Sequence, residues 1–287
     1  MPSATLKSPA DLTITPRDRR FGRGTAQARW WLGGDPIATA FYNALSVTFP
    51  RGEAFFIESV RAYRDTAPDK LRGEIRSFIT QEVMHTREHV AFNKQMVDAG
   101  YDIANLEKKV IETLALTKGR PEVLNLAVTM ALEHYTAIMA QQILEDAKIM
   151  ARADKEQADL WRWHAIEEIE HKGVAYDTWL FATKDWTRTK RWGVKALMMM
   201  IVTTRFWPKR YSGMIELLAQ DGITGVKAHA RMLWFLLGTP GVLRKLFLPW
   251  ASFFMPGFHP WNHDDRHLIH MVDSEYEAAR LPVALAA

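Results

Sequence analysis

One metal-ligand pattern occurs twice in this chain. In each copy a glutamate is followed by a Glu-x-x-His motif, after 28 residues in the first copy and 34 in the second. The first copy consists of Glu53, Glu82 and His85, and the second of Glu133, Glu168 and His171. Residues three apart on a helix share one face, so each motif presents an oxygen and a nitrogen ligand together. Four helices with this inventory can hold two metal ions between them.

Further residues on the same helices extend this set or compete with it. His164 stands four residues before Glu168, on the same stripe of the helix, and is predicted as a seventh ligand. Glu167 is an alternative to Glu168, because it also shares a face with His164. His89 is either another ligand or a hydrogen-bond partner of one. In both copies the residue before the second glutamate is acidic or an amide, Glu167 in one and Gln81 in the other.

Two neighbours of the isolated glutamates leave further alternatives open. Glu58 lies five residues after Glu53 and competes with it for the first ligand position. His134 directly follows Glu133, so on a helix it points about 100° away. We therefore expect His134 to support a ligand or to lie on the surface.

Apolar spacing and breaker residues predict the helices that would position these ligands. They are expected over 36–47, 51–65, 68–100, 102–117, 121–150 and 154–181. No sustained period-two alternation predicts a strand. We predict an all-α fold with three parts. These are a mobile basic arm over residues 1–30, a four-helix bundle over 31–183, and a helical, aromatic-rich extension over 184–287.

The double pattern resembles that of ferritin-like di-iron oxygenases, in particular the p-aminobenzoate N-oxygenase type. His164 adds to the similarity, whereas Gln81 departs from it, since an acid stands there in that type. Segments 49–53, 81–85 and 163–171 are also similar to a bacterial family of predicted metal-dependent hydrolases. The second similarity covers most of the chain, including its aromatic C-terminal region. Both resemblances imply a ferritin-like bundle around a dinuclear metal site.

Three functions are compatible with such a site. With two iron ions, the resemblance implies a di-iron oxidoreductase that uses O₂ to oxidise a hydrophobic or aromatic small molecule, which is the reading we favour. With zinc or manganese, the same ligands would serve a dinuclear hydrolase. A metal-storage protein without turnover is the third. No flavin or nicotinamide motif is present, so an oxygenase would need an external electron donor.

Composition narrows the chemistry and the location. The chain contains no cysteine, so disulfides, thiolate metal sites and cysteine nucleophiles are excluded. Residues 1–11 lack the apolar core of a signal peptide, and no run approaches the ~18 apolar residues of a membrane span. We therefore expect a cytoplasmic protein.

The extension combines basic and aromatic residues. Residues 184–210 carry eight Lys or Arg against one acid, and tryptophans and phenylalanines are interleaved with them. This composition fits peripheral membrane contact or, alternatively, a subdomain packed on the bundle. No nucleic-acid-binding module is recognised, so we expect no nucleic-acid partner. A group of histidines near the C-terminus is expected on a surface helix or against the bundle rather than on a second metal: His259, His263, His267 and His270.

Overall fold

The computed structural model describes residues 8–24 and 26–280. Within them the regular structure is helical, and the only β pairing is a single isolated bridge between Leu32 and Ala153. The predicted all-α class is therefore confirmed. The helices that carry the predicted ligands are α2 (Phe49–Arg61), α3 (Asp69–Asp98), α5 (Glu122–Glu145) and α6 (Lys155–His171). The others are α1 (Pro36–Ser46), α4 (Ala104–Ala115), α7 (Val174–Ala182), α8 (Arg188–Gln220), α9 (Gly225–Leu233), α10 (Val242–Ser252) and α11 (Arg266–Arg280).

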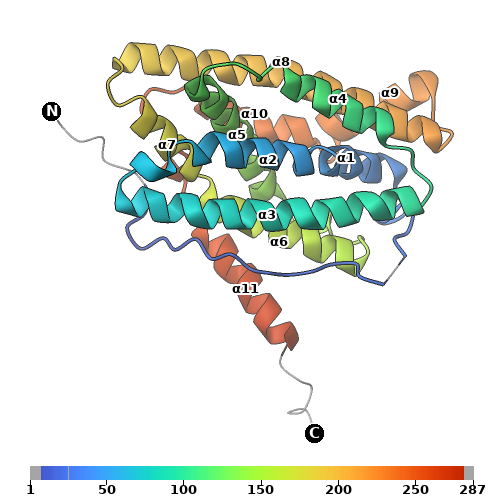
Figure 1. The fold of residues 1–287 in the computed structure, drawn as a ribbon. Helices are drawn as coiled ribbons and strands as arrows, with labels where there is room; N and C mark the ends of the chain where they lie inside the picture. The colour runs from blue at the N-terminus through green and yellow to red at the C-terminus, as the bar shows by residue number, and fades with distance from the viewer. Residues whose placement is uncertain (1–7, 25, 281–287) are drawn as a thin grey trace, which may run out of the picture.

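The four ligand-bearing helices pack as a bundle. Helix α2 lies against α3 and α5, and α6 lies against α5 and α3, so each helix has two neighbours in the set (Figure 1). Helix α1 begins where the Asp35 carboxylate caps it and Pro36 fits the first turn. Pro50 plays the same part in the first turn of α2. That this bundle is ferritin-like stays a prediction.

Helix α5 is the central rod of the bundle. Its length and apolar composition would let it cross a membrane, but about two thirds of its most apolar window is buried inside the protein. It also contacts α2, α6, α7, α8 and α10. The core helix of a globular protein meets the same test of length and hydropathy, so we assign α5 to the core.

The predicted helix over 154–181 is wrong in its continuity. The structure divides it into α6 and α7 at Lys172 and Gly173. Glycine is a poor helix former, and here the backbone approaches a neighbour closely. A Cβ on Gly173 would lie 2.6 Å from the Trp261 indole nitrogen. The break also directs the buried Lys172 ammonium to Asp265, at 2.5 Å.

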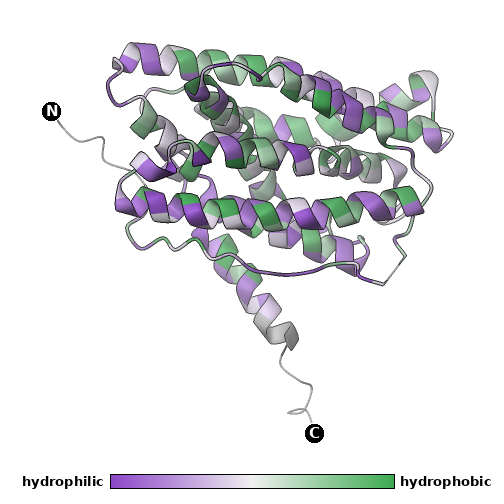
Figure 2. Ribbon diagram, in the orientation of Figure 1, coloured by the Kyte–Doolittle hydropathy of each residue, from purple (hydrophilic) through white to green (hydrophobic). Residues whose placement is uncertain are grey.

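The extension is more regular than its prolines and glycines suggest. We expected short pieces there, but α8 runs for 33 residues and includes Pro208, and α10 continues through Pro249. An internal proline costs about 3 kcal/mol in an isolated helix. Packing against the bundle offsets that cost, because α8 lies along α1 and α5. In Figure 2, hydrophilic and hydrophobic residues alternate along α8, as expected for a helix with one buried face.

The described part of the N-terminal arm is packed on the bundle instead of being a mobile tail. It runs along α3 and α6 (Figure 1), and Phe21 is buried against Trp163. Arg17 is the main anchor. Its guanidinium lies 2.7 Å from Glu170 of α6 and 2.7 Å from Asp273 of α11, and its backbone N–H donates to Glu167. Composition did not reveal this anchoring, because the acidic partners are more than 150 residues away in sequence.

Replacing Arg17 with alanine should lower the free energy of unfolding by about 3 kcal/mol, because the Glu170 carboxylate would stay buried without its cation. The matched control is Arg64→Ala, whose partner Asp65 is 82% exposed, so this change should cause a much smaller loss. Urea unfolding of the three proteins measures both values. Equal losses in the two variants would contradict the anchoring role.

Candidate metal centre

The predicted ligands converge inside the bundle. Each of these residues is at most 3% exposed, although all of them are ionisable. They come from different helices: Glu53 from α2, Glu82 and His85 from α3, Glu133 from α5, and His164, Glu168 and His171 from α6. The helices bring together residues that are up to 118 positions apart in sequence, from 53 to 171.

His171 faces three carboxylates. Its Nε2 lies 3.3 Å from Glu82 Oε1, 3.4 Å from Glu168 Oε1 and 3.5 Å from Glu133 Oε2. On the other side of the ring, Nδ1 is 3.0 Å from Gln81 Oε1. The Gln81 amide nitrogen already donates to Glu170, so its oxygen accepts the Nδ1 proton. In the neutral ring, Nε2 then presents a lone pair to the carboxylates, which is a repulsive arrangement unless a cation or a proton lies between them.

His85 is held in a related way from the other side. Its Nε2 lies 3.0 Å from Glu167 Oε2, while Nδ1 faces Glu168 Oε1 at 3.6 Å and Glu82 Oε2 at 3.9 Å. A carboxylate that orients the outer nitrogen of a histidine is a common support for metal-binding histidines. Glu167 therefore acts on His85 from outside the cluster, and its backbone partner is Arg17.

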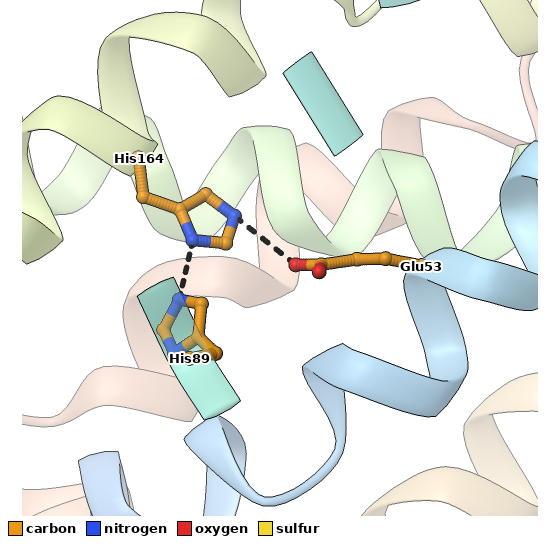
Figure 3. Close-up of side chains that lie close together, drawn as sticks. All are labelled: Glu53, His89 and His164. Carbon is orange, nitrogen blue, oxygen red and sulfur yellow. Dashed lines mark hydrogen bonds and ion pairs between the residues drawn. The ribbon is translucent and has the colours of Figure 1, made fainter. Parts of the chain in front are cut away.

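His164 links the cluster to a second row of polar groups (Figure 3). Its Nε2 is 2.9 Å from Glu168 Oε1 and 3.9 Å from Glu53 Oε1. Its Nδ1 is 2.7 Å from His89 Nε2, and His89 Nδ1 in turn is 2.9 Å from the Ser46 hydroxyl. Both ring nitrogens of His89 thus have hydrogen-bond partners, which favours a supporting role for His89.

Buried polar atoms without partners fall on the predicted ligands. In the described residues these include oxygens of Glu53, Glu82, Glu133 and Glu168, together with His85 Nδ1 and His171 Nε2. Nearly all buried polar groups in proteins are hydrogen-bonded, so such a concentration requires an explanation. Ligand atoms lie close enough to hold a metal ion in four overlapping triads. These are Glu53–His89–His164, His85–His164–Glu168, Glu53–Glu82–His85 and Glu82–Glu168–His171. Oxygen and imidazole donors without thiolates suit iron, manganese or zinc.

Burial shifts the pKa values of these groups in opposite directions. It raises the pKa of Glu53, Glu82 and Glu133 well above the ordinary value, and neighbouring carboxylates add to the effect. Burial lowers the pKa of His85, with His164 contributing next. Burial alone would raise the pKa of Glu168, but the nearby His171 and His164 hold it well below its usual range.

The structure separates the alternatives that the sequence left open. Glu53 is buried in the cluster, whereas Glu58 is exposed. His134 is buried but turns away from the cluster, and its Nε2 lies 3.1 Å from the Pro249 carbonyl. His259 is buried against Asp177, at 3.0 Å, while His263, His267 and His270 are exposed.

Sequence reasoning missed two supporting contacts. The Thr86 hydroxyl donates to Glu53 at 2.8 Å, and this depends on how α2 and α3 are aligned. Gln81 holds His171 on a different helix. Its position before Glu82 was visible in the pattern, but its partner was not.

A small apolar cavity of about 30 Å³ adjoins the cluster. His164 and Glu168 form its polar wall, and the rest is mostly aliphatic and aromatic. Trp161 and Phe49 close it beside the histidines, with the Phe49 ring centroid 4.7 Å from that of His164. A reactant in this cavity would therefore meet the cluster in apolar surroundings.

Comparison with known proteins identifies the family. A family model described as "Predicted metal-dependent hydrolase" matches residues 15–264, which include every residue of the cluster. The chain belongs to this family. No curated protein and no solved structure matches the chain. The resemblance to di-iron oxygenases receives no support from these comparisons.

In this member of the predicted metal-dependent hydrolase family, Glu167 should stabilise the metal-free protein more at pH 7 than at pH 9. Burial raises the pKa of Glu167 to about 8, so the folded state holds a proton that the unfolded state releases above its own pKa of about 4.5. That stabilisation is complete below the unfolded pKa and disappears as pH passes the folded one. The histidines with lowered pKa are neutral in both states in this window.

Between pH 7 and pH 9, the change in the free energy of unfolding of Glu167→Gln should lack a loss of about 1 kcal/mol that the wild type shows. Glu145→Gln, at an exposed site, should behave like the wild type. Chemical unfolding of the chelator-treated proteins at pH 7, 8 and 9 measures the difference. Equal changes in stability between pH 7 and pH 9 for the wild type and for Glu167→Gln would contradict the assigned pKa shift.

Proposed function

We propose that this chain is a dinuclear metal-dependent hydrolase that acts on a small hydrophobic molecule. The arrangement around His171 carries the proposal, because its inner ring nitrogen, which has a lone pair when the ring is neutral, faces three buried carboxylates. A divalent cation would turn this repulsion into coordination. The family description adds the reaction class. The hydrolase, which we first placed second to an oxygenase, is therefore the better-supported reading.

The ligand set of the proposal is Glu53, Glu82, His85, Glu133, His164, Glu168 and His171. Glu82 and Glu168 lie among the histidines of both helices, so they are proposed to bridge the two ions. Divalent ions held there would lower the pKa of a bound water and polarise an ester or amide carbonyl. The native metal of the proposal is zinc or manganese, with iron as the alternative.

The remaining side chains would prepare the site for this chemistry. Gln81, Glu167 and Thr86 fix the orientation of His171, His85 and Glu53 from outside. Phe49 and Trp161 exclude bulk water beside His164. The hydrogen-bonded row from His164 Nδ1 to His89 Nε2 and on to Ser46 offers a path for a proton that leaves the reacting water.

The second proposal for the same centre is O₂-dependent oxidation with two iron ions and an external electron donor. The apolar wall of the adjoining cavity favours it, since O₂ and an unfunctionalised hydrophobic substrate need no polar contacts there. Metal storage is weaker as a third reading, because storage gives no role to the apolar cavity beside His164.

Metal analysis after loading should find two ions per chain. Glu82→Ala or His171→Ala should lose at least one, because the two residues face the centre from two adjacent helices. Glu53→Ala should reduce the metal content, while its matched control on the same helix, the exposed Glu58→Ala, should not. Unchanged content in the Glu82 and His171 variants would refute the ligand assignment.

The same loaded proteins decide the reaction. Zinc or manganese protein should hydrolyse members of a panel of hydrophobic esters and amides, at a rate at least 100-fold above that of Glu82→Ala. If the iron(II) protein takes up oxygen and no metal-loaded form hydrolyses any substrate, the hydrolase proposal is wrong and the oxidase proposal takes its place. Bound metal with neither reaction would favour storage.

We also propose that α8 and α10 touch a membrane surface. A hydrogen bond from Trp250 to Thr203 joins the two helices, and Trp192 of α8 donates to the carbonyl of Phe254, two residues after the end of α10. Large apolar side chains are exposed on them: Trp192, Leu197, Met200, Ile201, Phe247 and Leu248. Residues 186–215 and 222–263 contain no Asp or Glu, and Arg188, Lys190 and Arg205 lie on α8. Apolar groups amid unopposed cations suit an anionic bilayer.

Vesicles with a fifth of anionic lipid should pellet the protein, and neutral vesicles should pellet much less. Changing Phe247 and Leu248 together to serine should weaken the binding at least fivefold, because these side chains are 58% and 75% exposed. The control is Val83→Ser on α3, where an apolar side chain is also exposed, at 53%. Failure of the wild-type protein to bind anionic vesicles would remove this partner.

A further inference from the structure

A second cavity, of about 90 Å³, lies between α2, α4, α5 and α8. Its walls are apolar apart from a few hydroxyls and three cations, and no acidic residue lines it. The cations are Arg205, Lys209 and Arg210, within two turns of α8. Three positive charges beside an apolar cavity are unusual without compensating carboxylates.

Arg210 is the most informative of the three. Its side chain is buried, with 4% of the residue exposed, yet it forms no ion pair with any carboxylate in the described part of the chain. One guanidinium nitrogen donates to the Ala44 carbonyl at 3.2 Å, and Nε has no hydrogen-bond partner. Desolvation by burial lowers the pKa of Arg210 to about 10. A buried cation of this kind is costly unless an anion pairs with it.

Arg205 and Lys209 extend the positive charge from Arg210 toward solvent. Arg205 is exposed, and Lys209 is half-buried with its Nζ 2.5 Å from the Thr113 hydroxyl. Neither forms an ion pair with a carboxylate among the residues that the structure describes. An anion that approaches from solvent would therefore meet Arg205 first and could be held by Lys209 and Arg210.

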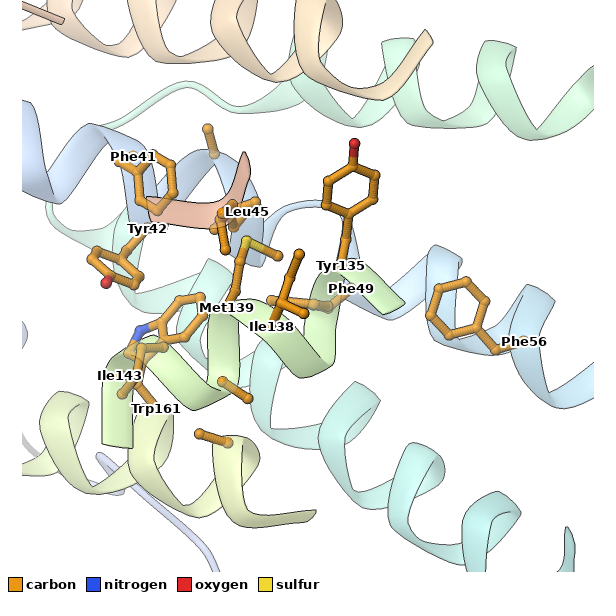
Figure 4. Packing of buried hydrophobic residues seen from close by; sticks show 14 of the residues in the cluster. Phe41, Tyr42, Leu45, Phe49, Phe56, Tyr135, Ile138, Met139, Ile143 and Trp161 are labelled. Atoms are coloured by element: carbon orange, nitrogen blue, oxygen red, sulfur yellow. The ribbon is translucent and has the colours of Figure 1, made fainter. Parts of the chain in front are cut away.

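This cavity adjoins the apolar cavity beside the metal centre. Leu45, Phe49, Thr136 and Met139 line both of them. Figure 4 shows Leu45, Phe49 and Met139 in the cluster of side chains between α1, α2 and α5. Methionine has three rotatable bonds, so Met139 can change rotamer at low cost and open the wall. An apolar chain could then pass from the α8 side toward His164.

We propose that the two cavities form one site for an amphipathic anion, with its carboxylate or phosphate at Arg205, Lys209 and Arg210 and its apolar chain directed past Phe49 and Met139. Binding itself follows from this lining alone. That this ligand is the substrate rests on the proposed function. In that case the bond to be hydrolysed lies in the apolar part of the ligand, several carbons from the anionic group.

The binding test uses calorimetry with octanoate, octyl phosphate, octanol and octylammonium on the full chain. Octanoate should bind at least tenfold more tightly than octanol, because only the anion pairs with the buried cation. Octylammonium should bind least. Tighter binding of octyl phosphate than of octanoate would assign the head group as phosphate, and the reverse would assign it as carboxylate. Equal binding of octanoate and octanol would overturn the proposal.

Two variants test the cations separately. Arg210→Met keeps most of the side-chain volume and should weaken octanoate at least tenfold while leaving octanol within twofold. If that variant fails to fold, Arg205→Met combined with Lys209→Met tests the same charge at half-buried and exposed positions. The control is Arg188→Met, an exposed arginine of the same helix that does not line this cavity. Unchanged octanoate affinity in both cation variants would overturn the site.

Running the titrations on metal-free and zinc-loaded protein separates this proposal from the proposed function. If the chain binds octanoate selectively but takes up no metal during loading, the anion site is supported and the dinuclear centre is refuted. Two bound metals without anion selectivity would do the opposite.

Discussion

Burial of carboxylates is the constraint on which the rest of this structure depends. Glu53, Glu82, Glu133 and Glu168 lie inside a four-helix bundle, and no arginine or lysine of the described residues forms an ion pair with them. Each keeps at least one oxygen without a hydrogen-bond partner. Charged groups in such a setting either take up protons or require cations. The raised pKa values of three of them show how strongly the metal-free bundle favours protons. Folding without metal therefore has a free-energy cost, the burial of these carboxylates, which bound metal ions would remove.

Each copy of the repeated motif supplies a residue that holds the histidine of the other copy in place. The residue before the second glutamate in each copy holds the histidine of the other copy: Gln81 contacts His171, and Glu167 contacts His85. This exchange explains why both positions carry a hydrogen-bonding side chain. It also fixes which ring nitrogen faces inward, Nδ1 of His85 and Nε2 of His171. Among the residues that the structure describes, those are the two buried histidine nitrogens without a hydrogen-bond partner.

Prediction from sequence succeeded where the determinants are local. The i, i+3 spacing of Glu82 and His85 was enough to predict that they share a buried face, because helical geometry sets it. The packing of the N-terminal arm was not predictable in this way, since Arg17 contacts Asp273 on α11, 256 residues later. The break at Gly173 depends on the approach of Trp261, also far away in sequence. Long-range contacts of this kind leave no periodic signal in a single sequence.

The ligands alone do not choose between hydrolysis and oxidation, because the same oxygen and imidazole donors suit zinc, manganese and iron. What distinguishes the reactions is the surface that meets the substrate. Here that surface is supplied by α1, α2, α5 and α8, outside the repeated motif, and it is apolar beside His164 and cationic toward Arg210. Because Phe49 contacts His164 and also lines both cavities, the proposed function would couple substrate position and metal chemistry through this one side chain. Specificity would then be set mainly by residues of these helices other than the metal ligands.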